Sequence, residues 1–231
     1  MVIFLPLILF FNDIDGFCYK YQMDKNDKNK NGLYEYFFDG EYSHQIKWRG
    51  EYKDGLKHGF VEAFHWRNGN LVRREFWEEG KEEGTWEQFD KDTGKLTSRA
   101  NFENGEQKNA EWFFENGQVE IRGDFKKNVQ DGEWEYFYES GQLAYKGRFK
   151  EGKENGLWQG FHENGVLLYS GEMSNGESEG LFEWFHDNGQ IQRRGHHKKG
   201  QLIGPWEYFD KDGLLLETKT FKDGKEINSS T

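Results

Sequence analysis

A repeat of about 24 residues constrains this chain more than any other feature of its sequence. With Gly132 as position 0, one clear copy reads G-E-W-E-Y-F-Y-E-S-G-Q-L-A-Y-K-G-R-F-K-E-G-K-E-N. The eight units begin at Gly32, Gly59, Gly84, Lys108, Gly132, Gly156, Gly180 and Gly204. Successive starts lie 27, 25 and then five times 24 residues apart. A period of this length indicates a repeat array in which each unit packs on its neighbours.

Bulky side chains recur at fixed positions of the unit. Position 2 is a large ring in six units, with Val61 and Ala110 as the exceptions. Position 5 is invariant, and we assign it a structural role in every unit: Phe37, Phe64, Phe89, Phe113, Phe137, Phe161, Phe185 and Phe209. We therefore expect one packing site to recur eight times along the chain.

Two sets of glycines punctuate each unit. The first follows a turn-forming residue, as in Asn116-Gly117, and Asn-Gly predicts a two-residue hairpin turn with positive φ at both positions. The second, such as Gly152, lies in a polar linking segment and predicts a looser turn. One extra residue before Gly69 and Gly94 predicts a bulged turn in those units, and three extra residues around Asp39 to Ser43 predict a loop.

The fold class that follows is all-β. We expect an elongated antiparallel sheet of eight ~24-residue β-hairpin units over residues 32–231, with about sixteen short strands. The chain is only 34% hydrophobic and 32% charged, which by itself suggests disorder, but 18% of its residues are aromatic. Disordered chains are poor in aromatic residues, so the composition favours short aromatic strands between tight turns.

The expected register makes a further prediction. A two-residue Asn-Gly turn places position 3 opposite position 14, for example Glu135 opposite Lys146. Position 3 is Glu in seven units and position 14 is Arg or Lys in six, so we expect a Glu–Arg ladder across the hairpins. Positions 2 and 5 are three residues apart, so a regular strand directs their side chains to opposite faces of the sheet. Either the strand is bulged between them or both faces of the sheet carry rings, and the sequence leaves these alternatives open.

The N-terminal residues differ from the array. Residues 1–18 begin with M-V-I-F-L-P-L-I-L-F-F and form a signal-like or anchoring apolar segment; residues 19–31 form a polar linker. The apolar run is too short to cross a bilayer, which needs about 20 residues. The alternative is a buried cap on the first repeat. The protein is exported or membrane-associated if residues 1–18 act as a signal, and cytoplasmic otherwise.

No catalytic constellation is visible, and we expect no enzyme activity, no metal and no cofactor. His65, His162 and His186 share position 6 and read as solvated turn residues; the pair His196-His197 is expected to be exposed. A net charge of −11 argues against nucleic acid and anionic lipid as partners, so membrane contact is expected only through residues 1–18.

The pattern G-x-W-x-x-F-x-x-x-G-x-L-x-x-x-G-x-F-x-x-G over residues 32–227 resembles the MORN repeat in its bacterial variant form. Proteins with this variant are similar to the YwqK-type antitoxin family. The resemblance implies an all-β binding module, with a toxin-neutralising antitoxin or immunity role as its specific form. The chain departs from the pattern at Lys108 and Ala110 of unit four and at His197 of unit seven.

Three functions remain open. The first is a non-enzymatic, monomeric scaffold that binds a protein partner, such as a toxin. The second is carbohydrate or cell-wall binding, because G-x-W-x-Y-F-x-x-x-G is also similar to choline- and glucan-binding repeats. The third is a phosphoinositide-binding scaffold. The candidate binding or packing aromatics are Trp86, Trp112, Trp134, Tyr136, Trp158, Trp184, Trp206 and Tyr208.

Overall fold

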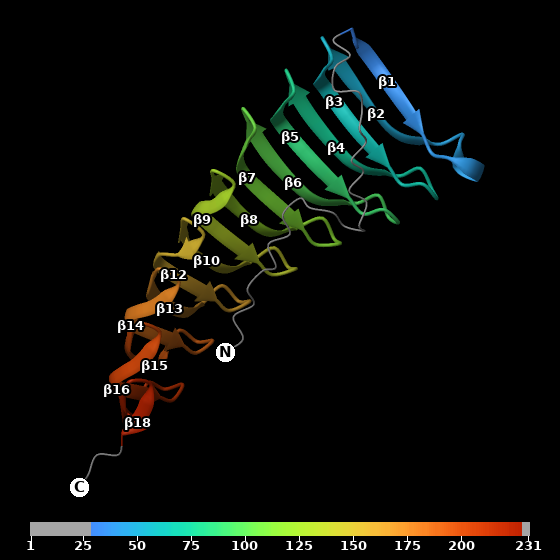
Figure 1. The fold of residues 1–231 in the computed structure, drawn as a ribbon. Helices are drawn as coiled ribbons and strands as arrows, with labels where there is room; N and C mark the ends of the chain where they lie inside the picture. The colour runs from blue at the N-terminus through green and yellow to red at the C-terminus, as the bar shows by residue number, and fades with distance from the viewer. Residues whose placement is uncertain (1–28, 228–231) are drawn as a thin grey trace.

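The computed structural model describes residues 29–227 and shows one long, twisted antiparallel sheet (Figure 1). Its strands are β1 (Gly32–Phe37), β2 (Ile46–Lys53), β3 (Leu56–Phe64), β4 (Leu71–Glu78), β5 (Lys81–Phe89), β6 (Leu96–Glu103), β7 (Glu106–Phe113), β8 (Val119–Lys126), β9 (Val129–Phe137), β10 (Leu143–Lys150), β11 (Lys153–Glu154), β12 (Gly156–Phe161), β13 (Leu167–Ser174), β14 (Glu177–Phe185), β15 (Ile191–Lys198), β16 (Gln201–Phe209), β17 (Leu215–Lys222) and β18 (Lys225–Ile227). A short 3-10 helix, η1 (Gly40–Tyr42), occupies the loop expected in unit one. The all-β prediction is confirmed.

The hairpins follow one another along the long axis in chain order, from the blue end to the red end of Figure 1. The described residues form 18 strands rather than about sixteen, because one linking arm forms the separate strand β11 and β18 follows the last full hairpin. The predicted apolar segment 1–18 and most of the linker 19–31 lie outside the described residues. Within residues 29–227, no helix has the length and hydropathy needed to cross a membrane.

The Asn-Gly turns are not the two-residue turns that we predicted. In unit four, Phe114 N–H donates to Gln118 O at 2.9 Å and Gly117 N–H donates to Phe114 O at 2.9 Å, which closes a three-residue loop. Only Gly117 adopts a positive φ, at 86°. The Asn116 side chain holds the loop instead, since it accepts from Gln118 N–H at 2.9 Å and donates to Glu139 O of the next unit at 2.9 Å. Asn is therefore selected here for its side-chain hydrogen bonds.

The linking segments contain the two-residue turns. Glu151 and Gly152 have φ values of 51° and 77°, and the flanking Lys150 and Lys153 pair. Positive φ at both central residues is the type I′ geometry, whose twist matches that of the strands. The polar turns that we expected to be looser are therefore the tighter ones. The residues with positive φ in these turns are Asp54-Gly55, Glu79-Gly80, Asn104-Gly105, Lys127-Asn128, Glu151-Gly152, Asn175-Gly176, Lys199-Gly200 and Asp223-Gly224.

A bulge after the three-residue loop restores the predicted register. Phe137 lies opposite Leu143, while Tyr136 lies opposite Tyr145, so Ala144 is an extra residue in β10. The loop moves the pairing by one residue and the bulge moves it back. Position 3 therefore faces position 14 as predicted, although the turn from which we derived that register is different. The longer turns of units two and three are also present, where Gly69 N–H bonds to His65 O and Gly94 N–H to Asp90 O.

Both faces of the sheet carry rings, which decides between the two alternatives for positions 2 and 5. No bulge separates positions 2 and 5 on the first strand of the hairpin, so Trp134 and Phe137 point to opposite faces. We call the face with positions 2, 4, 13, 15 and 17 the aromatic face, and the face with positions 1, 3, 5, 11, 14 and 16 the ladder face.

The core lies on the aromatic face, between neighbouring units. Trp134 is 2% exposed and lies across Gly123 of the preceding unit, where a Cβ atom would be 2.2 Å from the indole ring. Its Nε1–H donates to Asp124 O at 3.1 Å, at the point where β8 and β9 shift register. The same hydrogen bond recurs from Trp86 to Phe76 O, from Trp158 to Arg148 O and from Trp206 to His196 O. In units three, five, six and eight, Trp at position 2 therefore joins its hairpin to the previous one.

The departures of units four and seven have local explanations. Ala110, which replaces Trp, lies opposite Ala100, and both are buried. Ala100 stands where Gly lies against Trp134, Trp158 and Trp206. Lys108 replaces Gly at the register shift between β6 and β7. This shift places one extra residue on β7, whereas the shift between β8 and β9 places two extra residues on β9. His197 was expected to be exposed, but its ring lies edge-on to Phe182 at 4.7 Å. It occupies the position of the late aromatic residue, which a neutral imidazole can fill.

Candidate functional site

A ladder of mostly charged side chains runs along the ladder face and is interrupted in unit six by Gln159 and Ser170 and in unit eight by Thr218. The predicted pairs within hairpins are present as directly opposed residues: Glu35 with Arg49, Glu62 with Arg74, Glu87 with Arg99, Glu111 with Arg122, Glu135 with Lys146, Gln159 with Ser170, Glu183 with Arg194 and Glu207 with Thr218. The structure adds the contacts between hairpins, as in Arg49 with Glu62 at 2.6 Å and Arg194 with Glu207 at 2.7 Å. The ladder therefore connects units as well as strands.

Among the ladder carboxylates that form ion pairs in residues 29–227, Glu62 is the most buried, with a side chain 10% exposed. Burial alone would raise its pKa, but the guanidinium groups of Arg49 and Arg74 outweigh this effect and lower the pKa. The other ladder arginines are about 40–50% exposed, so each of their ion pairs contributes about 0–1 kcal/mol. The ladder pairs with exposed arginines therefore stabilise the sheet only slightly.

The invariant Phe residues lie on the ladder face beneath these cations. The Arg122 guanidinium lies 5.1 Å from the centre of the Phe137 ring. The same arrangement recurs for Arg49 over Phe64, Arg99 over Phe113, Lys146 over Phe161 and Arg194 over Phe209. Such contacts are worth about 0.5–1 kcal/mol at exposed sites. These five rings thus pack under the cation of the preceding unit.

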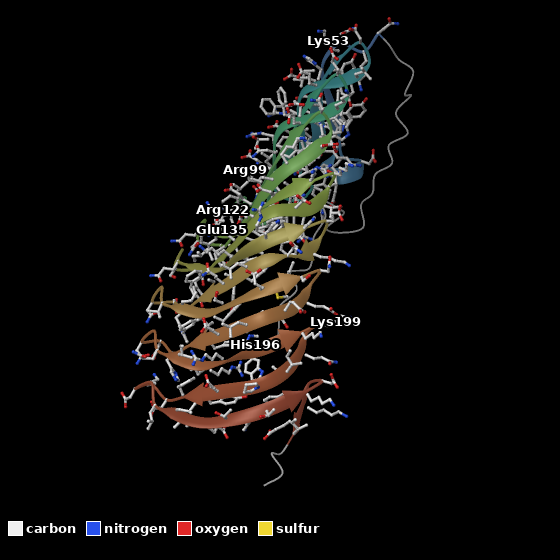
Figure 2. The ribbon with its side chains drawn as sticks, turned by 90° about the vertical axis from the view of Figure 1, so that its left-hand side faces the viewer. Lys53, Arg99, Arg122, Glu135, His196 and Lys199 are labelled. Atoms are coloured by element: carbon white, nitrogen blue, oxygen red, sulfur yellow. The ribbon has the colours of Figure 1, made fainter. Side chains whose placement is uncertain are left out.

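An open groove of about 800 Å³ lies on the ladder face of units two to five. Figure 2 shows three of its charged residues, Arg99, Arg122 and Glu135, following one another along one side of the sheet. Its lining consists of Phe60, Arg74, Thr85, Glu87, Arg99, Asn101, Asn109, Ala110, Glu111, Arg122, Gly123, Asp124, Glu133 and Glu135. Strands β3 to β9 supply these residues, so a regular sheet holds every side chain in place.

The groove contains residues that sequence reasoning did not single out. Positions 1 and 16 form a row beside the ladder, and this row includes Phe60, Thr85, Asn101, Asp124 and Glu133. These positions vary from unit to unit while positions 3 and 5 on the same face stay nearly constant. Variation at an exposed position of an otherwise regular array was the signal that could have indicated a specific surface.

The predicted aromatics lie on the opposite, aromatic face. Trp86, Trp134, Trp158, Trp184 and Trp206 are all buried. Trp112, Tyr136 and Tyr208 are half-buried beside them. The sheet brings Trp112, Trp134, Tyr136 and Trp158 into one continuous row of ring contacts. Burial raises the pKa of the Tyr136 phenol. These rings therefore pack against one another on the aromatic face.

Position 6 links neighbouring turns. His162 Nε2 lies 3.0 Å from Phe185 O, and His186 Nε2 lies 3.1 Å from Phe209 O. Tyr138 uses the same position to donate to Phe161 O at 2.7 Å. These histidines therefore bond to the next unit rather than to solvent alone, while His65 contacts Asn68 in its own turn. No group of three His, Cys, Asp or Glu residues suited to a metal occurs in the described part of the chain.

Comparisons with known proteins identify part of the array. The curated proteins include none that matches. A solved structure described as "Crystal structure of GtfA/B complex" is 12% identical, with a TM-score of 0.20, and the match covers 55% of this chain and 18% of that chain. The family model described as "MORN repeat variant" matches residues 107–127, 130–151, 154–175 and 178–199. Four consecutive repeats of this sheet are thus similar to the MORN repeat variant, as the sequence pattern predicted.

Proposed function

We propose that this protein is a non-catalytic repeat scaffold that binds a protein partner along its ladder face. The observation that carries the proposal is the difference in accessibility between the two faces of the sheet. The aromatic face buries its rings against neighbouring units, whereas the ladder face presents an open groove of about 800 Å³. A binding surface needs side chains that are accessible yet held rigidly, and strands β3 to β9 provide this.

The chemistry of the groove suits a protein better than the alternative partners. Sugar-binding repeats stack their ligands on exposed rings, but the tryptophans at position 2 are buried here. Anionic lipid headgroups require free cations, whereas Arg74, Arg99 and Arg122 each contact a ladder carboxylate. The net charge of −11 also opposes binding to an anionic membrane. An exposed ring bordered by polar and charged groups matches the apolar core and polar rim of a protein interface.

The finer form of the proposal is a toxin-neutralising antitoxin or immunity role. Support for it comes from the resemblance to the YwqK-type family, in addition to the acidic surface, which suits a basic protein partner. If the partner is a toxin, its expression alone stops growth and co-expression with this protein restores growth. Growth that remains arrested, at confirmed expression of both proteins, argues against the antitoxin role while leaving the scaffold role intact.

Affinity capture tests the scaffold role. The immobilised full chain is compared with a groove variant, Arg99→Glu with Arg122→Glu, and the captured proteins are identified by mass spectrometry. The matched control reverses two exposed charges at the far end of the array, Lys222→Glu with Lys225→Glu. We expect a partner that the control retains and the groove variant loses. Equal capture by all three proteins would refute binding through the groove.

A further inference from the structure

We propose, building on the protein-binding function above, that the groove takes an extended polypeptide segment in one orientation. In this arrangement an apolar residue of the partner contacts Phe60, and a Lys or Arg about seven to nine residues away contacts Asp124 and Glu133. The proposal rests on the chemical gradient along the row formed by positions 1 and 16 on the ladder face.

One end of the row is apolar. Phe60 is 49% exposed, and its ring meets Phe76 edge-on with the centroids 5.2 Å apart. The Phe60 ring therefore has a packed edge and an accessible surface. The Arg74 guanidinium lies 6.0 Å from the centre of the Phe60 ring, so this ring lies beside the charged ladder. An apolar side chain of a partner would remove more of this ring from water, and such buried anchors dominate binding energy.

The middle of the row is polar and uncharged. Thr85 Oγ1–H donates to Asn101 Oδ1 at 2.9 Å, and Asn101 Nδ2–H donates to Asn109 Oδ1 at 2.8 Å. This chain of hydrogen bonds orients the amides and leaves the Asn109 amide N–H groups without an acceptor among residues 29–227. A backbone carbonyl of an extended segment can accept from them. A helix could not, because its own carbonyls are already bonded within the helix.

The other end of the row is acidic. Asp124 makes no ion pair with any described residue, and Glu133 contacts only Arg148, at 3.3 Å, with both side chains 64% exposed. Five carboxylates and three guanidinium groups line the groove, and the ladder contacts already occupy the guanidinium groups. The free charge is therefore negative and lies at the end opposite Phe60. A cation of the partner would complement it.

The strand spacing sets the length of the segment. Phe60 lies in β3, Asp124 in β8 and Glu133 in β9, so five or six strand spacings separate the two ends. At about 4.8 Å per spacing this is about 24–29 Å, which seven to nine extended residues span at about 3.3 Å each. The segment crosses the strands instead of pairing with them, so side chains rather than sheet edges recognise it.

Selection from a random peptide library displayed on phage tests the proposal, with the immobilised full chain as bait. We expect enriched sequences with an apolar residue and a basic residue about seven to nine positions apart, in one chain direction. Phe60→Ala should remove the apolar preference alone. Asp124→Asn with Glu133→Gln should remove the basic preference alone. Absence of enrichment, another spacing, or preferences that persist in the variants would overturn the proposal.

A fluorescein-labelled copy of the most enriched peptide gives the magnitudes. We expect Phe60→Ala to weaken its binding about tenfold, and Phe60→Leu to restore most of the loss. The two acidic substitutions together should weaken it about threefold to tenfold at low salt, and less at high salt. Unchanged thermal melting of each variant confirms folding. If capture of the natural partner depends on the groove but the selected peptides lack this spacing, only the extended-segment proposal is wrong. If capture of the natural partner does not depend on the groove, the proposed binding function of the ladder face is wrong.

Discussion

Substitution of Gly123 by Ala tests the contact that joins one hairpin to the next. A Cβ atom at Gly123 would lie 2.2 Å from two atoms of the Trp134 ring, so the indole must move by more than an ångström. That ring is 2% exposed and meets Phe125 and Phe149 edge-on at 5.4 Å. Overpacking of this kind costs about 1–3 kcal/mol.

Two smaller effects modify this magnitude. Displacement of the indole weakens the hydrogen bond from its Nε1–H to Asp124 O, which is worth about 0.5–1.5 kcal/mol. Against this, replacing Gly by Ala lowers the entropy of the unfolded chain, and where the backbone permits it this stabilises by about 0.4–1 kcal/mol. Gly123 does not have a positive φ, so the gain applies. We expect a net loss of about 1–3 kcal/mol for Gly123→Ala.

A double-mutant cycle with Trp134→Ala isolates the clash. Once the ring is removed, Gly123→Ala should cost nothing or stabilise slightly, which gives a coupling energy of about 2 kcal/mol in urea unfolding followed by circular dichroism. The junction of units three and four already contains this Ala pair, Ala100 with Ala110. Additive effects of the two substitutions would refute the reasoning.

The junction of units three and four also offers the converse cycle, in case Trp134→Ala unfolds the protein. Ala110→Trp alone should destabilise, because Ala100 occupies the place of the usual glycine. Ala100→Gly in the Ala110→Trp background should recover stability. No recovery would show that the pairing of a small residue with the ring is incidental.

Three further predictions concern stability. His197→Phe should stabilise the protein by about 1 kcal/mol, because burial lowers the His197 pKa and Nδ1 has no hydrogen-bond partner among residues 29–227. Wild-type stability should fall as the pH drops below about 6.5, where the unfolded chain takes up a proton more readily than the folded protein. The variant should lose this pH dependence in thermal melts at pH 5 and pH 8. Glu62→Gln should lower the free energy of unfolding in urea by about 1–3 kcal/mol, because two guanidinium groups lose their carboxylate. Since the Glu62 pKa is lowered in the folded protein, the stabilisation by Glu62 should disappear as the pH falls through that pKa. Glu207→Gln, whose carboxylate is more exposed and makes a single contact, should cost less. Asn116→Ala should cost about 1–2 kcal/mol by thermal melting because two hydrogen bonds are lost, whereas an unchanged melting temperature would contradict the role assigned to its side chain.

Much of the architecture could be predicted from the sequence. The period of 24 residues specifies one repeated unit, and the alternation of side chains along a strand specifies which positions share a face. Glu135 was expected opposite Lys146 and lies there. This prediction held because two local differences cancel: the turn is one residue longer than expected and Ala144 forms a bulge. The same register occurs in units six and eight, where Gln159 faces Ser170 and Glu207 faces Thr218, so the loop and bulge set it and opposite charge is not required.

The turn types themselves could not be read correctly from dipeptides. Asn-Gly favours a two-residue turn in isolation, but Asn116 bonds to Glu139 of the next unit, and that contact exists only in the assembled array. Glu151-Gly152 carries no strong turn signal, yet both residues adopt positive φ because the strands on either side pair without an intervening loop.

Which face is free was decided only by the tertiary structure. The repeat pattern places rings on both faces, and nothing in one unit distinguishes Trp134 from Phe137 as the buried ring. The distinction arises between units, because Trp134 lies over Gly123 of the preceding hairpin and is bonded to the carbonyl beside it. Sequence alone thus determined the unit, its strands and the ladder, since these depend on local periodicity. The shift of register between hairpins determined the core and the groove, since packing between units depends on where neighbouring backbones meet.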